Sequence, residues 1–547
     1  MPHRLWLSLA MLSTGTVFLA AAQLAGASAD RRGGIFRVGT TGASVQVDPQ
    51  LAYITTAWWL QYATAAKLYN YPDKRGLAGS RLVPEVASSF KVSRGGTRYT
   101  FFIRKGFRFS DGTPVTAASF KYAINRVANH DLASPGAQFI TDTNGTNIVG
   151  AQDVNDGRAT DVRGVQARGK RLIIDLTRPD GAFLSKITMP FFQATSARLP
   201  LDREVVMVNG MNDLPSAGPY TYTRNDVNRL TSIRKNPYWR RAPRRGRDRP
   251  RNLDGVDVLW NLNEQIAFEQ VKNNELDEGP LPAAEVQSVV NQYGVNKTRF
   301  WAMPLNCIDF LPMNLANDLF KGNLRLRQAI NYAINRSAYI GQAGAYAGTP
   351  WTHILTPAVP GWRNENPYPL KPDLPRARAL AAGHFRDGKI TVYFRSSGTI
   401  NPAQAQIVRQ DLINLGFRPE DITMKGFSGG NIYTAWGAHG HDGDIAVSMG
   451  WCSDLPDPAG QVAAALIVSY TNAPRWLLKL QAASKLVGRK RFETLGRLDI
   501  EIMKKVAPIA VQRYFNNRYF FSDRVDPKSL VYQAVYLDWS IPALALK

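Results

Sequence analysis

The chain has 547 residues, which is too long for one hydrophobic core and predicts two or three domains. Its 44% hydrophobic and 20% charged residues exclude an intrinsically disordered chain and indicate a globular one. A formal charge of +24 can indicate nucleic acid, an anionic membrane surface or acidic molecules as partners.

The first 29 residues have the pattern of a secretory signal peptide. His3 and Arg4 precede an apolar run from Leu5 to Ala22, and Ala27-Ser28-Ala29 is a small-x-small cleavage site. The run is short for a membrane span, and no cysteine follows it that could carry a lipid anchor. We therefore expect a soluble, extracytoplasmic mature chain of charge +23, which argues against nucleic acid and favours a solubilising surface that adheres to the envelope.

The beginning of the mature chain predicts a strand, a turn and a helix. Residues 33–39 predict the strand, Val47-Asp48-Pro49 the turn, and residues 53–69 a mostly apolar helix. Trp58 and Trp59 lie within this helix, so we expect them in the core rather than against a ligand.

A β-rich segment comes next. Residues 99–116 predict two strands, separated by a glycine turn and followed by a Ser-Asp-Gly-Thr-Pro turn. Thr116 is a suitable N-cap for a helix through Val127, and residues 171–176 predict a further strand. We assign none of these elements to ligand binding.

Residues Arg240 to Arg251 include seven arginines and are interrupted by two prolines and a glycine. Such a segment cannot bury itself, so a solvated loop is expected. It has no interleaved aromatic residues, which argues against a nucleic-acid groove. Contact with anionic envelope lipid is a hypothesis for this segment.

The second half of the chain alternates strands and helices, which is typical of an α/β lobe. An amphipathic helix is predicted over residues 324–336 with Asn323 as its cap, and another over residues 491–505. Residues 389–394 predict a strand. Asn401-Pro402 begins a helix that ends at Leu415-Gly416, and a last strand begins at Val511, after Pro508.

The most informative stretch is 445–458. Ile445 to Gly450 predicts one buried strand, and Asp457-Pro458 predicts the start of a helix over 459–469, with Asp457 as the N-cap. Ligands of open α/β sheets bind beyond the carboxyl ends of strands, where Trp451 and Asp454 would lie. Asp454 is therefore either a residue that meets a ligand cation or a solvated acid in a turn.

Residues 439–444 (His-Gly-His-Asp-Gly-Asp) form the one metal-like cluster in the sequence. Two histidines and two aspartates could ligate a metal, but a turn before the Ile445 strand explains the glycines and aspartates equally well. No distant histidine or cysteine supports a metal site, so none is predicted.

Several motifs, in this order, resemble the extracytoplasmic solute-binding proteins of family 5, the oligopeptide- and dipeptide-binding proteins that serve ABC importers. They are Tyr-Thr-Phe at 99–101 with Asp-Gly-Thr-Pro at 111–114, Gly-Pro-Tyr at 218–220, Asn-Pro-Tyr-Trp at 236–239, Arg-Gln-Ala-Ile at 327–330, and Gly-Trp-Cys-Ser-Asp at 450–454.

The resemblance implies an α/β, two-lobed periplasmic-binding-protein-like fold of type II with an extra subdomain. Lobe I would comprise 30–75, 190–303 and 507–547, its extra subdomain 76–189, and lobe II 304–506. The hinge would lie near Met303 to Asn306 and Val506 to Pro508. The implied mechanism is capture without chemistry, in which ligand closes the lobes and a membrane permease reads the closed form.

The resemblance also implies a binding site. Asp454 would receive the α-amino group of a peptide, with Trp451 as a wall, Cys452 beside it, and Tyr433 or Trp436 opposite. Tyr53 and Thr55 would edge the site. Two cysteines in an exported chain most often pair, and relatives make the equivalent link, so a Cys307–Cys452 disulfide is expected.

No cofactor or catalytic residue is predicted, and a monomer is expected. Relatives bind nickel complexes, glutathione, haem or oligosaccharides, so the ligand class stays open. The segment from Trp436 to Gly450 holds no arginine for a ligand carboxylate, which leaves peptide length open as well. An exported hydrolase is the alternative from another class, but the sequence has neither a Gly-x-Ser-x-Gly nor a His-Glu-x-x-His motif.

Overall fold

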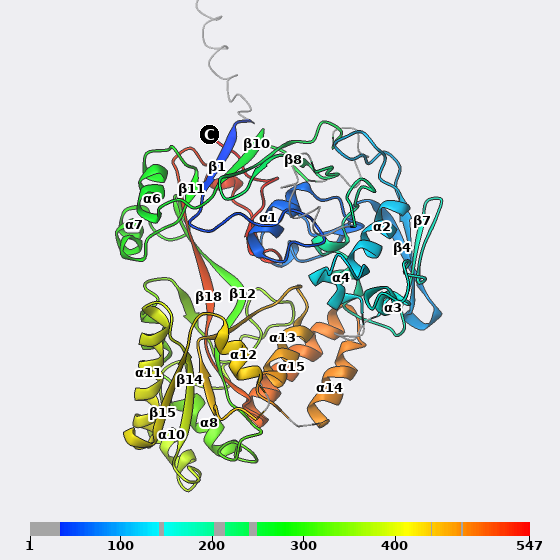
Figure 1. Ribbon diagram of the computed structural model, residues 1–547. Helices are drawn as coiled ribbons and strands as arrows, with labels where there is room; N and C mark the ends of the chain where they lie inside the picture. Colours follow the sequence, from blue (N-terminus) through cyan, green and yellow to red (C-terminus); the bar gives the residue numbers. More distant parts are fainter. Residues whose placement is uncertain (1–32, 142–146, 202–213, 240–248, 439, 472–473) are drawn as a thin grey trace, which may run out of the picture.

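Two bodies of the chain lie one above the other in the computed structural model, and two long strands run from one to the other (Figure 1). The structure describes residues 33–141, 147–201, 214–239, 249–438, 440–471 and 474–547. The predicted signal peptide at 1–29 lies outside these residues. Among the described helices, none is long and apolar enough to cross a membrane.

The two long strands are β12 (Phe300–Pro312) and β18 (Ile509–Phe521), which pair in antiparallel orientation. Their register shifts between Pro304 and Ile308, where three residues of β12 face one residue of β18. Such a bulge bends a strand pair, so the connection between the two bodies is irregular at this point.

The upper body, lobe I, contains most of a nine-stranded sheet with the order β17-β12-β18-β11-β1-β10-β9-β8, and β13 pairs with β18. The strands not yet given are β1 (Ile35–Gly39), β8 (Tyr220–Asp226), β9 (Leu230–Lys235), β10 (Gly255–Leu259), β11 (Glu278–Gly279), β13 (Gly348–Pro350) and β17 (Met449–Cys452). The helices of this lobe are α1 (Thr55–Thr64), α6 (Glu264–Lys272) and α7 (Val286–Tyr293), and its short ladders are β2 (Tyr69–Asn70) with β3 (Val83–Pro84) and β19 (Tyr532–Gln533) with β20 (Asp538–Trp539).

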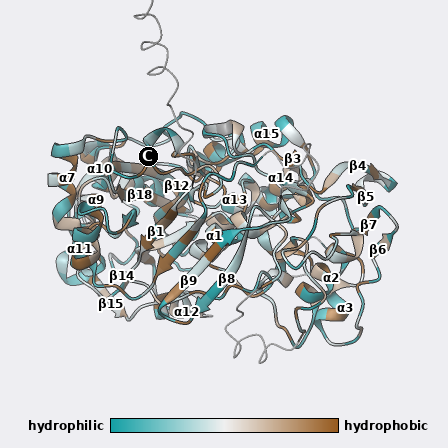
Figure 2. Ribbon diagram, turned by 90° about the horizontal axis from the view of Figure 1, so that it is seen from above, coloured by the Kyte–Doolittle hydropathy of each residue, from teal (hydrophilic) through white to brown (hydrophobic). Residues whose placement is uncertain are grey.

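A separate four-stranded antiparallel sheet with the order β4-β5-β7-β6 lies at one end of lobe I, away from the three-stranded sheet described below (Figure 2). Its inner face packs in the same hydrophobic core as β1, because Phe101 and Phe36 belong to one buried cluster. The elements are β4 (Ala87–Ser93), β5 (Arg98–Ile103), β6 (Val165–Arg168), β7 (Arg171–Asp175), α2 (Ala117–Ala128), α3 (Ala151–Asn155) and α4 (Phe183–Lys186).

The lower body, lobe II, has a parallel three-stranded sheet with the order β15-β14-β16 and helices around it (Figure 1). Its strands are β14 (Ile390–Arg395), β15 (Ile422–Phe427) and β16 (Ile445–Val447), and its helices are α8 (Leu324–Ala333), α9 (Arg336–Gly341), α10 (Leu374–Ala381), α11 (Ile400–Leu415), α12 (Asn431–Gly437), α13 (Pro458–Ile467), α14 (Pro474–Ser484) and α15 (Gly488–Lys505). The mixed α/β architecture predicted from the sequence is confirmed.

The structure corrects two sequence-based expectations about the path of the chain. The predicted single strand from Ile445 to Gly450 is two strands in two sheets, because the chain turns at Ser448, whose φ is +60°. The second crossing also lies later than Val506 to Pro508. Val506, Ala507, Ile509 and Val511 pack in a core of lobe II, and residues of β18 reach the core of lobe I only from Tyr519 onward.

Candidate functional site

Tyr53 and Asp454 meet between the two lobes. The Tyr53 hydroxyl donates a hydrogen bond of 2.7 Å to Oδ1 of Asp454, across 401 positions of sequence. The neighbouring Leu455 packs against the core of lobe I. Two residues that the sequence analysis placed at the edge and the centre of one site are therefore in direct contact.

A buried ion pair holds the segment that carries Tyr53. Asp48 accepts two hydrogen bonds from the Arg126 guanidinium of α2, at 2.9 and 3.1 Å, and both side chains are fully buried. The Tyr53 ring then contacts the rings of Trp58, Phe139 and Phe191. Tyr53 is nevertheless 42% exposed, so its position is fixed while part of its surface remains accessible.

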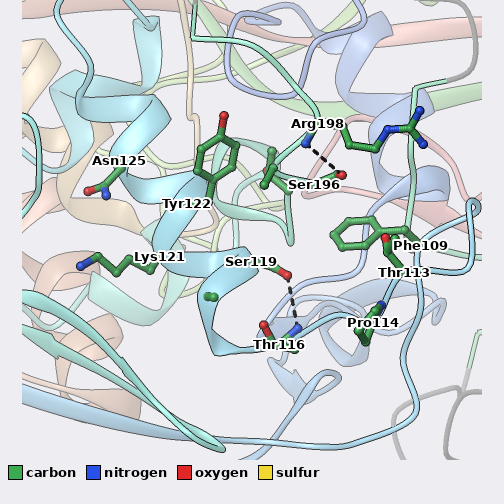
Figure 3. A pocket seen from close by; sticks show the side chains of 13 residues that line it. Phe109, Thr113, Pro114, Thr116, Ser119, Lys121, Tyr122, Asn125, Ser196 and Arg198 are labelled. Atoms are coloured by element: carbon green, nitrogen blue, oxygen red, sulfur yellow. Dashed lines mark hydrogen bonds between the residues drawn. The ribbon is translucent and has the colours of Figure 1, made fainter.

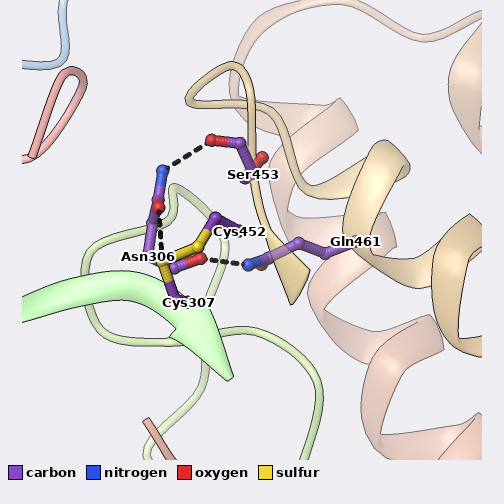
Figure 4. The surroundings of a disulfide bond; sticks show 5 residues. All are labelled: Asn306, Cys307, Cys452, Ser453 and Gln461. Atoms are coloured by element: carbon purple, nitrogen blue, oxygen red, sulfur yellow. Dashed lines mark hydrogen bonds between the residues drawn. A yellow bond between two sulfur atoms is a disulfide. The ribbon is translucent and has the colours of Figure 1, made fainter. Parts of the chain in front are cut away.

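The segment that carries Asp454 is held by the disulfide. In the pairing of β17 with β12, Cys452 lies directly opposite Cys307, and the two sulfurs are bonded, which confirms the predicted link (Figure 4). Beside it, the Asn306 side chain donates to the Ser453 carbonyl at 2.9 Å, and Gln461 of α13 donates to the Asn306 carbonyl at 2.5 Å. The residue before Asp454 is thus tied to β12.

A second buried ion pair holds the other side of this segment. Asp457 caps α13 as predicted, because its Oδ1 accepts a hydrogen bond from the Ala459 amide at 3.0 Å. Both of its oxygens also accept from Arg491 of α15 at 2.7 Å. Asp454 therefore lies on a short loop that is held at both ends.

Burial controls the electrostatics of this carboxylate. Partial burial raises the pKa of Asp454 above its ordinary value, and the hydrogen bond from Tyr53 acts in the opposite direction. Burial also raises the pKa of Tyr53, so this hydroxyl keeps its proton and remains a donor. An acid in such a setting gains more from a cationic partner than an acid on an open surface does.

The predicted aromatic residues differ in exposure. The side chains of Trp451 and Tyr433 are 43% and 44% exposed, and Thr55 is exposed as the first residue of α1. Trp436 is only 3% exposed, and its indole donates to the Val468 carbonyl at 2.7 Å. The expectation that Trp436 could wall the site is therefore wrong, because tertiary packing buries this ring.

Arg395 is a candidate residue that the sequence analysis missed. It ends β14, and its Nη2 donates to the Tyr433 hydroxyl at 3.2 Å. Its Nε is buried and has no hydrogen-bond partner among the described residues. The pattern of the predicted strand could not single out Arg395. What makes this residue a candidate is its contact with Tyr433 of α12, which only the fold reveals.

A buried acid lies within electrostatic reach of Arg395. Burial raises the pKa of Asp309, while Arg513, a hydrogen bond from Tyr339 and the charge of Arg395 act to lower it. Arg513 is 3.1 Å from this carboxylate. Asp309 is paired with Gly450 in the ladder of β12 and β17, and Gly450 directly precedes Trp451 in β17.

A pocket of about 610 Å³ lies elsewhere, at the start of α2 (Figure 3). The figure shows Lys121 and Arg198 at its margin, and each is paired with an aspartate, Asp161 and Asp111 respectively. None of the predicted ligand contacts lines this pocket.

The metal-like cluster is part of the packing of lobe II. The His441 ring contacts the rings of Trp436 and Tyr470 in tilted geometry, and Asp444 accepts a hydrogen bond from the Thr391 amide at 2.9 Å. The structure groups no three His, Cys, Asp or Glu residues as metal ligands in the part of the chain that it describes, and His439 lies outside that part.

The arginine-rich segment is not a solvated loop throughout. Residues 240–248 lie outside the described residues, but Arg249 is only 9% exposed. It donates to the Tyr62 and Ala65 carbonyls and lies 3.5 Å from Glu85. The expectation of full solvation is therefore wrong for Arg249, because buried acceptors compensate its charge.

Comparison with known proteins gives one family. Residues 81–470 match the family described as bacterial extracellular solute-binding proteins, family 5 Middle. The chain is 23% identical to di/tripeptide-binding protein 2 of Pseudomonas aeruginosa (strain UCBPP-PA14) over 76% of each chain. It is 24% identical to the glutathione-binding protein GsiB of Escherichia coli O1:K1 / APEC over 66% of this chain and 68% of the other.

A solved structure supports the fold. Clavulanic acid biosynthesis oligopeptide binding protein 2 superposes with a TM-score of 0.80 at 20% sequence identity, over 94% of this chain and 96% of the other. At this identity the likeness shows a shared fold, and the predicted two-lobed binding-protein architecture is confirmed.

Proposed function

Because the chain belongs to family 5 of the bacterial extracellular solute-binding proteins, we propose that it captures peptides between its lobes, with the peptide α-amino group at Asp454. It then delivers them to an ABC importer in the membrane. The observation that carries the proposal is the hydrogen bond between Tyr53 of lobe I and Asp454 of lobe II. One residue from each lobe therefore reaches the place where a ligand cation would bind.

In this proposal capture involves no bond chemistry. The peptide ammonium pairs with the partly buried Asp454 carboxylate, while Tyr53 orients that carboxylate from the other lobe. Trp451 contributes an exposed aromatic surface next to the cation. Main-chain pairing of the peptide with the protein would make binding tolerant of peptide sequence.

Arg395 is proposed to receive the peptide carboxylate. Its guanidinium lies 5.6 Å from the centre of the Tyr433 ring and keeps a buried Nε without a described partner. A planar guanidinium binds carboxylates in bidentate fashion, and Tyr433 would hold it in place. The segment from Trp436 to Gly450 holds no arginine for a ligand carboxylate. In this proposal Arg395 of β14 has that role instead.

Calorimetry with modified peptides tests both assignments. We expect Asp454→Asn to reduce the affinity for an unmodified peptide by about 100-fold or more, because the variant removes a charged partner from a partly buried ammonium. An N-acetylated peptide should bind equally weakly to both proteins. Glu420→Gln, an exposed acid of lobe II, is the matched control.

The proposed role of Arg395 in binding the peptide carboxylate is tested in the same way, with a protein variant and a modified peptide. Arg395→Gln should weaken binding of a free peptide, and a C-terminally amidated peptide should not distinguish it from the wild type. Unchanged affinity in Asp454→Asn would reject the α-amino site, whereas a loss in Arg395→Gln that persists with the amidated peptide would reject only the carboxylate site.

Glutathione is a second candidate ligand, because one relative of similar identity is named a glutathione-binding protein. Glutathione also carries an ammonium and carboxylates, so it would use the same two groups. Native mass spectrometry of the purified protein with its co-purified solute separates the two candidates by mass. We further propose that the mature protein is an extracytoplasmic monomer.

A further inference from the structure

The outer face of the four-stranded sheet is exposed and basic. The pairing of the strands places Ser89, Phe102, Arg171 and Arg168 in one row across β4, β5, β7 and β6. The next row contains Lys91, Thr100, Ile173 and Gln166. The opposite face packs in the core, as the burial of Phe101, Leu172 and Ile174 shows.

Cations gather at the edge of this face formed by the β6–β7 hairpin. Arg168 and Arg171 are paired directly opposite each other, and Gly169, with a φ of +58°, and Lys170 form the turn between them. Lys105 lies near this hairpin, because the amide of Ile103, two residues before it, donates to the Lys170 carbonyl at 2.7 Å. Like charges directly opposite each other in a sheet are destabilising, so this arrangement opposes stability.

These cations are not neutralised within the described chain. Lys91, Lys105, Arg168, Lys170 and Arg171 are all exposed, and none forms an ion pair with a described residue. The one acid of the face, Asp175, lies at the far end of β7 and is bound by Arg98 at 2.6 Å. We name these five residues together with Phe102 the basic sheet face.

An aromatic ring accompanies the charges. Phe102 is 38% exposed and lies opposite Arg171 in the ladder. Phe102 thus places one phenyl ring among the cations, on a face where polar side chains are the rule. Basic residues beside an exposed aromatic side chain form the combination that binds at the interface of an anionic bilayer.

We propose that the basic sheet face docks on the surface of an anionic lipid bilayer. The face lies at the opposite end of the molecule from β14, β15 and α11 (Figure 2). A bilayer suits this face better than an acidic protein does, because the face is a sheet surface whose charges are spread along an edge, with one phenyl ring to enter the headgroup region. This proposal is independent of the ligand.

Vesicle binding tests the proposal with the full mature chain. Sedimentation with vesicles of phosphatidylglycerol and phosphatidylcholine is compared with sedimentation with phosphatidylcholine alone. The triple variant Arg168→Ser, Lys170→Ser and Arg171→Ser should lose about 100-fold in partition coefficient on the anionic vesicles at low salt. The control variant Lys321→Ser, Lys371→Ser and Lys389→Ser removes equal charge from exposed sites of lobe II.

Three further results bear on docking to the bilayer. Equal losses in the two triple variants would overturn the proposal, because net charge alone would then explain binding. Binding of the wild type to polyglutamate but not to anionic vesicles would overturn it in favour of an acidic polymer. Phe102→Ser should reduce vesicle binding by a factor that high salt does not remove, since insertion of the ring is not screened.

Discussion

At the scale of single residues, the hydrogen bond between Tyr53 and Asp454 connects the two lobes. The resemblance singled out Asp454 as a binding residue and placed Tyr53 at the edge of the site. Their hydrogen bond could not be predicted, because it depends on how the lobes come together rather than on any local pattern. This bond also affects the protonation of the acid, since it offsets part of the effect of burial, which raises the pKa of Asp454.

Tyr53→Phe should therefore change the pH dependence of binding. Without the donor, the pKa of Asp454 rises further, so a larger fraction of the carboxyl is protonated at acidic pH and cannot pair with an ammonium. We expect a loss of about tenfold in peptide affinity at pH 5 and a smaller loss at pH 8, from a bond of about 1.5 kcal/mol. Calorimetry at both pH values measures this, and an equal loss at both would contradict it.

Asp411 makes a separate prediction about stability. This residue lies on the buried face of α11, and burial raises the pKa of its carboxyl from 3.8 to about 7. The folded state thus holds a proton that the unfolded state releases above about pH 4, so the contribution of this group is favourable at low pH and is lost as the pH rises through 7.

Asp411→Asn should remove this dependence. The amide can still accept the hydrogen bond of 2.8 Å that the Asn335 amide donates. We expect little change in the free energy of unfolding at pH 4 and a gain of up to about 4 kcal/mol at pH 8. Denaturant unfolding at the two pH values gives both numbers, and destabilisation at pH 8 would refute the argument.

At the scale of elements, sequence reasoning succeeded where the signals are local. Asn323 caps α8, Gly416 ends α11 and Asp457 caps α13, as predicted from end signals within a few residues. It failed where tertiary contacts decide. The turn at Ser448, which divides β16 from β17, depends on pairing with two different sheets, and the burial of Trp436 depends on its contact with Val468.

The buried pair Asp48–Arg126 joins two elements, and its loss should be severe. Asp48→Ala leaves the Arg126 charge buried without its carboxylate, so we expect a loss of about 3–5 kcal/mol in the free energy of unfolding. Glu493→Ala, which breaks an exposed pair with Arg489 on α15, should lose far less, because solvent screens this pair. Thermal and denaturant unfolding of the two variants provide the comparison, and similar losses would contradict the role given to burial.

At the scale of the whole molecule, the two lobes touch at places other than Tyr53 and Asp454. A Cβ added at Gly181 would lie 2.1 Å from the Leu486 carbonyl oxygen and 2.8 Å from Arg491 Nη1. Gly181 follows β7 in the chain, while Leu486 lies between α14 and α15. The lobes therefore approach each other so closely here that only a residue without a side chain fits.

Gly181→Ala should consequently hinder closure without touching the ligand. The methyl group would collide with main-chain atoms, which cannot move as a flexible side chain can, so an arrangement with the lobes this close becomes less favourable relative to one with the lobes further apart. Since ligand is held by both lobes in the proposed mechanism, peptide affinity should fall by about tenfold or more while the unfolding temperature without peptide stays unchanged. Gly341→Ala, at a position with open space around it, is the matched control. Small-angle scattering should show a smaller decrease in radius of gyration on addition of peptide for Gly181→Ala than for the control, and an identical decrease in both would show that this contact does not limit closure.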